Sequence, residues 1–279
     1  MTILRRLANR SFTAARQSRL FSSANDYIET KPHASISGVH VMSLKRAPVN
    51  SLDLDFLEAI PETILRLEKE PGVQGIILAS ANESVFSAGL DIPALIGKDR
   101  EYLTKFGDMF QYAWTSLYGT TLAVVAEING HALAGGCLLT SCADYRVMLK
   151  QAQIGLPEVH LGIVAPIYLR EMAVSLMGRR AAEWALLTGH AMPADLAQSL
   201  GLVKDTKEEV RTRAEEIIFS LVKLNEQGRV VTKIEMRRPL VTMNNALRNE
   251  NREAFASLLS KPEVQASLKA YYESMKKRK

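Results

Sequence analysis

The sequence has 279 residues, of which 47% are hydrophobic and 23% are charged, so the chain can bury a sizeable core and does not have the composition of a disordered protein. Its formal charge of +5 would favour a nucleic-acid or acidic-membrane partner if the basic residues were spread over the fold. They are concentrated instead, because residues 1–25 hold five arginines and no Asp or Glu, which leaves 30 basic and 30 acidic residues in the remainder. This neutral remainder argues against nucleic-acid binding.

The N-terminal segment is rich in Arg and Ser, free of acidic residues and loosely amphipathic, which is typical of a mitochondrial transit peptide. Its apolar stretches are too short for a secretory signal or a membrane span. We therefore expect residues 1–24 to direct the chain to the mitochondrial matrix, with cleavage near Phe21. A disordered basic tail is the alternative. We expect a core domain over residues 25–205, a helical C-terminal trimerisation region over residues 206–279, and no integral membrane segment.

The cysteines and histidines give no support to metal or redox chemistry. Cys137 and Cys142 fit neither a disulfide scaffold nor a Cys-x-x-Cys motif. The five histidines are scattered without the spacing of metal ligands. We therefore expect the two thiols to pack in the core, and we expect no metal site.

The first part of the chain predicts a strand, a helix and a second strand. Residues 34–45 and 73–79 carry the apolar runs of strands. The intervening residues 54–67 carry apolar side chains at helical spacing, which Asn50 or Ser51 can cap and Pro61 should kink or divide. Such a β-α-β unit predicts a parallel pair of strands.

The later segments predict further strands and then mainly helices. Residues 100–118 read as a helix, and residues 122–128 and 143–148 as buried strands. Residues 165–224 are mainly helical in pattern, with a strand-like return at residues 201–203. The tail has helical patterns broken at residues 237–239 and 261–262, and too little apolar surface for a core of its own. It must therefore pack on the main body or on a neighbouring subunit.

Three short motifs bring together groups suited to proton transfer beside a carbonyl. Gly135 and Gly136 follow a strand at the start of a predicted helix, where backbone N–H groups can approach a ligand oxygen. Glu158 stands among apolar residues, so burial should make its carboxylate more basic than usual. Ala88 and Gly89, after another strand, form the third motif. Each motif also has a purely structural interpretation: Gly135 and Gly136 as a tight helix–strand contact, Ala88 and Gly89 as an ordinary turn, and Glu158 as a carboxylate at a helix N-terminus. Taken together, they favour a catalytic site.

Four segments resemble the crotonase (enoyl-CoA hydratase/isomerase) superfamily: FSAGLD (86–91), INGHALAGGC (128–137), CADYR (142–146) and PEVHLG (157–162). The resemblance extends over roughly residues 34–205, and APVNSL (47–52) and LGIVAP (161–166) are similar to its isomerase members. It implies an α/β crotonase fold of repeated ββα units with a helical C-terminal region, assembled as a homotrimer. It also implies an acyl-CoA substrate without a separate cofactor, because coenzyme A is part of the substrate.

The resemblance also implies roles for single residues. The N–H groups of Ala88 and Gly135 would hold the thioester oxygen, where two donors stabilise an enolate, and Glu158 would be the base. Asp91 is explained equally well as a helix cap. Contacts to coenzyme A would come from Lys45, Ala47, Ala88, Gly89, Leu90, Asp91, Ile92, Gly135 and Pro157, with Lys233, Arg237 and Lys276 as candidates near its phosphates.

Position 138 separates two reactions of this superfamily. Its hydratases carry a second glutamate there, whereas this chain has Leu138. Adding water needs two groups that handle protons, but a 1,3 proton shift needs only one base, which takes a proton from C2 and returns it at C4. The sequence therefore predicts isomerisation of 3-enoyl-CoA to trans-2-enoyl-CoA in fatty-acid β-oxidation. A dienoyl-CoA isomerase, an acyl-CoA thioesterase and a non-catalytic binding protein of the same fold stay open as alternatives.

Overall fold

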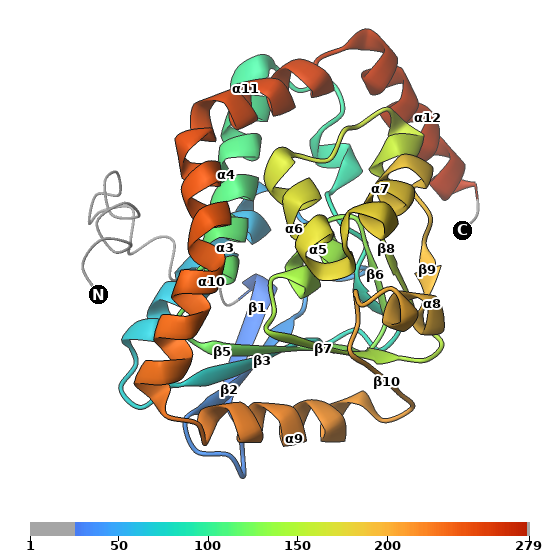
Figure 1. Cartoon of the computed structure of the whole chain (residues 1–279). Coiled ribbons are helices and arrows are strands. Elements are labelled where there is room, and N and C mark those ends of the chain that lie inside the picture. Colours follow the sequence, from blue (N-terminus) through green and yellow to red (C-terminus); the bar gives the residue numbers. More distant parts are fainter. Residues whose placement is uncertain (1–25, 278–279) are drawn as a thin grey trace.

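The computed structural model describes residues 26–277, so the predicted leader lies outside the described residues. Its larger sheet has six strands in the order β1-β2-β3-β5-β7-β10 (Figure 1). The first strand runs antiparallel to its neighbour, and the remaining neighbours pair in parallel, as the β-α-β pattern predicted. The bounds are β1 (Ile28–Pro32), β2 (Val39–Leu44), β3 (Gly75–Ser80), β5 (Ala123–Ile128), β7 (Tyr145–Leu149) and β10 (Asp205–Lys207).

A second, smaller sheet stands at the carboxyl ends of the central strands. It consists of β4 (Val85–Ser87), β6 (His131–Leu133), β8 (Gln153–Gly155) and β9 (Met192–Pro193), with β9 antiparallel to β8. Three of these short strands follow directly on β3, β5 and β7, and each pair is followed by a helix. The predicted repeat of ββα units is therefore confirmed. Because the short strands lie side by side, the turns that leave them converge, which is where α/β folds place ligands.

Helices pack on both sides of the larger sheet. They are α3 (Leu54–Lys69), α4 (Arg100–Tyr118), α5 (Gly135–Ser141), α6 (Ile167–Met177), α7 (Arg179–Thr188), α8 (Ala194–Ser199) and α9 (Val210–Val222), with the 3-10 helices η1 (Ile92–Ala94) and η2 (Pro157–Leu161). Figure 1 shows α9 below the sheet and α4, α5 and α6 above it. Side chains of a strand alternate between faces, so Ile77 packs in the cluster under α9, whereas Ile76 and Leu78 enter the main core.

The C-terminal region continues with α10 (Glu226–Ala246), α11 (Arg248–Leu259) and α12 (Pro262–Lys276). These helices pack on the main body of their own chain. The ring of Phe255 on α11 stacks on Phe106 of α4 with the ring centroids 6.1 Å apart. Gly107 permits this approach, since a Cβ there would lie 2.8 Å from Phe255 Cδ1. Leu268 and Val264 of α12 are buried as well.

Several boundaries differ from the sequence prediction. Asp53 caps α3 by accepting from the Phe56 N–H, so neither Asn50 nor Ser51 has that role. The helix also runs through Pro61 without division, because its buried face anchors both halves in the core. Helix α10 also continues through Pro239. The last strand of the larger sheet lies at β10 rather than at residues 201–203.

Candidate active site

The turn between β6 and α5 is held in a conformation that L-residues rarely adopt. Ala134 has φ +51° and ψ −120°, a conformation that costs free energy and persists only where the surrounding contacts enforce it. Its N–H donates to the Gly155 carbonyl of β8 at 2.8 Å, and its carbonyl accepts from the Leu138 N–H at 3.1 Å. The next N–H, that of Gly135, opens α5 and has no hydrogen-bond acceptor among residues 26–277, as expected for the first residue of a helix.

The end of β4 packs backbone-to-backbone against this turn, and glycines make the approach possible. A Cβ on Gly136 would lie 2.4 Å from the Ser87 carbonyl oxygen. A Cβ on Gly89, which has φ +90°, would lie 2.5 Å from Ala134 Cβ and 2.8 Å from Gly135 N. Side chains at either position would therefore separate the two segments that carry the predicted oxygen-binding groups.

The free N–H on the β4 side belongs to Leu90 and not to Ala88. The Ala88 N–H already donates to the Val49 carbonyl at 3.0 Å, which counts against the role expected for it. The Gly89 carbonyl accepts from the Leu52 N–H at 2.8 Å. In a trans peptide the C=O and N–H point to opposite sides, so the Leu90 N–H points away from Leu52, and no acceptor for it exists within the described residues.

The carboxylate of Glu158 is the most unusual ionisable group at this junction. It lies in η2, directly after β8, and its Oε2 is buried without a hydrogen-bond partner among the described residues. Burial raises the pKa of Glu158 to about 7, because a desolvated carboxylate is less stable in its charged form. Burial also raises the pKa of the Cys137 thiol on α5 to about 12, with a second contribution from the charge of Glu158. Glu158 is therefore electrostatically coupled to the helix that Gly135 opens.

The turn that carries Glu158 is anchored at both ends. The Glu158 carbonyl accepts from the Ile163 N–H at 3.1 Å. His160 Nε2 lies 3.2 Å from the carbonyl oxygen of Gly189, at the end of α7. These contacts fix the backbone of η2 and with it the direction in which the carboxylate enters the site.

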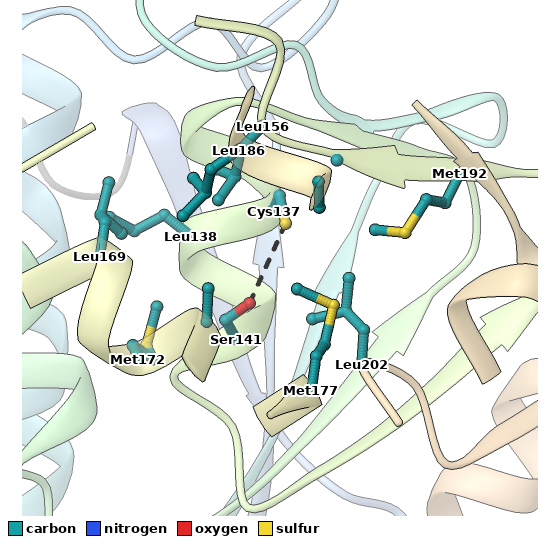
Figure 2. Close-up of a pocket in the computed structure, with 13 residues that line it drawn as sticks. Cys137, Leu138, Ser141, Leu156, Leu169, Met172, Met177, Leu186, Met192 and Leu202 are labelled. Carbon is teal, nitrogen blue, oxygen red and sulfur yellow. Dashed lines mark hydrogen bonds between the residues drawn. The ribbon is translucent and has the colours of Figure 1, made fainter. Parts of the chain in front are cut away.

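Leu138 is buried on α5 and faces an apolar cavity (Figure 2). The cavity has a volume of about 10 Å³, on the order of the room that one water molecule needs. The described residues that line it include Leu156, Leu169, Met172 and Met192, with no carboxylate among them. The side chain at position 138 therefore lies in apolar surroundings without a carboxylate.

Comparison with known proteins identifies the family. The family model described as enoyl-CoA hydratase/isomerase matches residues 35–278. The chain belongs to this family. It is 35% identical over 265 residues to "Enoyl-CoA delta isomerase 1, mitochondrial" of Homo sapiens, covering 94% of this chain and 87% of the relative. The Rattus norvegicus protein of the same name is 34% identical over 267 residues, or 94% of this chain and 91% of the relative.

A solved structure and a relative with a different name complete the comparison. The crystal structure of human mitochondrial delta3-delta2-enoyl-CoA isomerase has a TM-score of 0.88 and 35% identity, covering 91% of this chain and 99% of that chain. A crotonyl-CoA hydratase of Syntrophomonas wolfei is 29% identical over 202 residues, or 72% of this chain and 74% of the relative. The enoyl-CoA hydratase/isomerase family and the crotonase fold are thus shown, and the reaction within the family needs a separate argument.

The segments expected to contact coenzyme A lie side by side in this family member. Lys45 and Ala47 are exposed in the segment after β2. Arg46, between them, pairs with Asp91 at 2.8 Å and with Asp53 at 2.7 Å. Asp91 also caps η1 through the Ala94 N–H at 3.3 Å, so its carboxylate has a structural role. Among the other expected contacts, Ala88 is exposed, Gly89 is buried, Leu90 and Ile92 are half-buried, and Pro157 opens η2.

Two of the three candidates for phosphate contacts have another role. Lys233 Nζ donates to Asp144 Oδ2 at 2.8 Å and to the Leu122 carbonyl at 2.6 Å. Arg237 donates to Asp144 Oδ1 at 2.7 Å and to the carbonyls of Tyr118 and Cys142. They attach α10 to the sheet, which counts against the phosphate contacts expected from charge alone. Lys276 is exposed and pairs with Glu273 at 3.1 Å.

Proposed function

We propose that this chain is an enoyl-CoA isomerase that converts 3-enoyl-CoA to trans-2-enoyl-CoA by a proton shift on a single glutamate. The observation that carries the proposal is the state of Glu158, whose Oε2 is buried without a partner among the described residues and whose pKa is raised to about 7. A base with that pKa is half ionised near neutral pH and is stronger than an ordinary carboxylate. The similarity to proteins named enoyl-CoA delta isomerase supports the same reaction.

In the proposed mechanism the thioester oxygen binds between the Leu90 and Gly135 N–H groups. Glu158 removes a proton from C2, and the charge of the resulting enolate collects on the oxygen that the two N–H groups hold. Removing one such donor typically lowers kcat by about 10²–10³-fold. Glu158 then returns the proton at C4, which leaves the double bond between C2 and C3. Leu138 has no group that could take part in proton transfer.

Hydration of a 2-enoyl-CoA is the second candidate, because a crotonyl-CoA hydratase is among the relatives. It would need a second group to handle protons. Position 138, where hydratases of this superfamily carry a second glutamate, holds Leu138, and the described residues that line the cavity it faces include no carboxylate. Isomerisation is therefore the better supported reaction.

A spectroscopic assay tests the proposal. Purified protein is incubated with a 3-enoyl-CoA, and the conjugated 2-enoyl-CoA product is followed by its absorbance; the same preparation is then given a 2-enoyl-CoA and assayed for hydration. We expect fast isomerisation and little hydration. Fast hydration with slow isomerisation would contradict the assignment.

We also propose that the mature protein works in fatty-acid β-oxidation in the mitochondrial matrix as a homotrimer. Relatives named as mitochondrial and the composition of residues 1–24 support the location. Deleting residues 1–21 should leave activity intact and abolish import. Light scattering of the mature form should give a multiple of three subunits, and an active monomer would contradict the assembly.

A further inference from the structure

Ser87 and Asn50 form a buried hydrogen-bonded pair beside the Gly89–Leu90 peptide. Ser87 is 0% exposed and Asn50 is 1% exposed. The Ser87 hydroxyl donates to the Asn50 carbonyl at 2.8 Å and accepts from the Gly89 N–H at 3.2 Å. A single hydroxyl thus links the Asn50 backbone to the residue that precedes Leu90.

Asn50 is itself fixed from several directions. Its amide donates to Ser80 Oγ at 2.8 Å and to the Phe86 carbonyl at 2.9 Å, and its Oδ1 accepts from the Arg46 N–H at 2.7 Å. Its φ of +50° lies in the left-handed region, which Asn tolerates better than most residues. A buried side-chain amide with this many hydrogen bonds is rigid. It holds the Asn50 backbone in place, and the backbone carbonyl of Asn50 is therefore a fixed acceptor for the Ser87 hydroxyl.

We propose that Ser87 and Asn50 are positioning residues that fix the direction of the Leu90 N–H. The inference rests on the proposed function, in which that N–H binds the thioester oxygen. Leu52 holds the Gly89 carbonyl at 2.8 Å and Ser87 holds the Gly89 N–H, so the peptide groups on both sides of Gly89 are restrained. Gly89 needs such restraint because a residue without a Cβ can adopt many backbone conformations besides the φ of +90° that it has here. The Leu90 N–H stabilises the enolate oxygen only if it already points at that oxygen before the reaction. Rotation of the Gly89–Leu90 peptide would remove this alignment.

The test uses a signal that does not depend on turnover, together with kinetics. Octanoyl-CoA labelled with ¹³C at C1 cannot isomerise, and hydrogen bonds to its carbonyl lower the infrared stretching frequency when it binds. We expect the frequency shift seen with the parent to become smaller in Ser87→Ala, with octanoyl-CoA affinity little changed. We expect kcat for 3-enoyl-CoA to fall by about tenfold or more, short of the 10²–10³-fold loss of a whole donor, with KM affected much less.

Two further variants keep the test decisive. Ser87→Cys retains the shape of the side chain with a weaker donor and acceptor, so it should give an intermediate shift and rate, and it replaces Ser87→Ala where that variant fails to fold. Ser141→Ala removes another buried hydroxyl, which lies 4.0 Å from Cys137 Sγ on α5, and should keep the parental shift.

A parental shift and kcat in Ser87→Ala would overturn the inference while leaving the isomerase proposal intact. The same is true of equal losses in Ser87→Ala and Ser141→Ala. A parent without isomerase activity, whose carbonyl shift still depends on Ser87, would reject the isomerase proposal and keep the positioning role. A parent that binds octanoyl-CoA without any carbonyl shift would reject both.

Discussion

Gly189 lies directly against His160, with its carbonyl oxygen 3.2 Å from the ring Nε2. A Cβ on Gly189 would lie 2.7 Å from the same nitrogen and 2.7 Å from Val159 Cγ1. The end of α7 therefore supports η2, the turn that presents Glu158. Gly189, which is distant from Glu158 in the sequence, thus helps to control its position through His160.

Gly189→Ala tests this support. The φ of +61° at Gly189 costs an L-residue roughly 1–2 kcal/mol, and the crowding of His160 adds to it. We expect a lower thermal midpoint together with a lower kcat, since η2 must shift. Gly97→Ala is the control, because Gly97 has φ +68° and a Cβ added to it would meet no distant residue within 4 Å. The control should lose stability without losing kcat, and equal effects of both variants on kcat would contradict the argument.

The second prediction concerns Asp144, which holds Lys233 and Arg237 on α10. Asp144→Asn should destabilise the protein by about 3–5 kcal/mol, because it leaves two largely buried cations without their counter-charge. Affinity for coenzyme A should stay near the parental value, as measured by calorimetry. Glu273→Gln, which removes the exposed partner of Lys276, should change stability by less than about 1 kcal/mol. A large loss of CoA affinity in Asp144→Asn without a loss of stability would restore the phosphate-contact role of these cations.

Much of the fold could be predicted from the sequence, because its main elements have long periodic patterns. The helix at α4 matches the predicted residues 100–118, and the strands β3, β5 and β7 lie within two residues of their predicted positions. Strands β4, β6, β8 and β9 have two or three residues each, too few to show an alternation. Pro61 and Pro239 do not divide their helices. Buried residues on both sides of Pro61 hold α3 together, whereas Lys233 and Arg237 attach α10 before Pro239 and Val241 is buried after it.

Some residues of the candidate site could be predicted from sequence motifs, and others depend on contacts that only the folded structure shows. Glu158 and Gly135 stand in motifs that could be recognised by residue type. The choice between Ala88 and Leu90 depends on contacts from a distant part of the chain. The Val49 carbonyl accepts from the Ala88 N–H, and the Leu52 N–H donates to the Gly89 carbonyl, which leaves the Leu90 N–H free among the described residues. Lys233 and Arg237 show their charge in the sequence, but their partner Asp144 is found only in the fold.

Leu138→Ala tests whether Leu138 is needed for the isomerisation reaction or only for packing of the protein. Truncating a buried leucine should cost about 2–5 kcal/mol of stability, and Leu139→Ala, which truncates an equally buried neighbour, is the control for that loss. Isomerisation should persist in both variants, because Glu158 alone moves the proton. Neither variant should hydrate a 2-enoyl-CoA efficiently. Loss of isomerisation in folded Leu138→Ala, with activity kept in Leu139→Ala, would give Leu138 a larger part in the reaction.

The pH dependence of activity tests Glu158 as the base. With its pKa raised to about 7, kcat/KM should rise as the pH passes through about 7 and level off above it, since only the ionised carboxylate accepts a proton. Glu158→Gln should lower kcat by at least the ~10²–10⁴-fold that a general base typically contributes, with CoA-ester affinity near normal. A near-parental rate in Glu158→Gln would reject the mechanism.

Stability against pH gives an independent check on the same group. A carboxyl whose pKa is higher in the folded state than its ordinary value of 4.5 contributes stability that is fully present below about pH 4.5 and is lost as the pH rises through about 7. Glu158→Gln cannot ionise, so at pH 8 it should be more stable than the parent, by an amount on the order of 3 kcal/mol from the size of the pKa shift. Glu62→Gln is the matched control, because burial and the charge of Glu58 raise the pKa of Glu62 to about 7 as well. Denaturant titrations at pH 5 and pH 8 should show a pH-dependent gain in both variants, whereas only Glu158→Gln should lose isomerase activity. If Glu158→Gln gains nothing at pH 8 while Glu62→Gln does, Glu158 is solvated in the folded protein and the raised pKa on which its catalytic role rests is wrong.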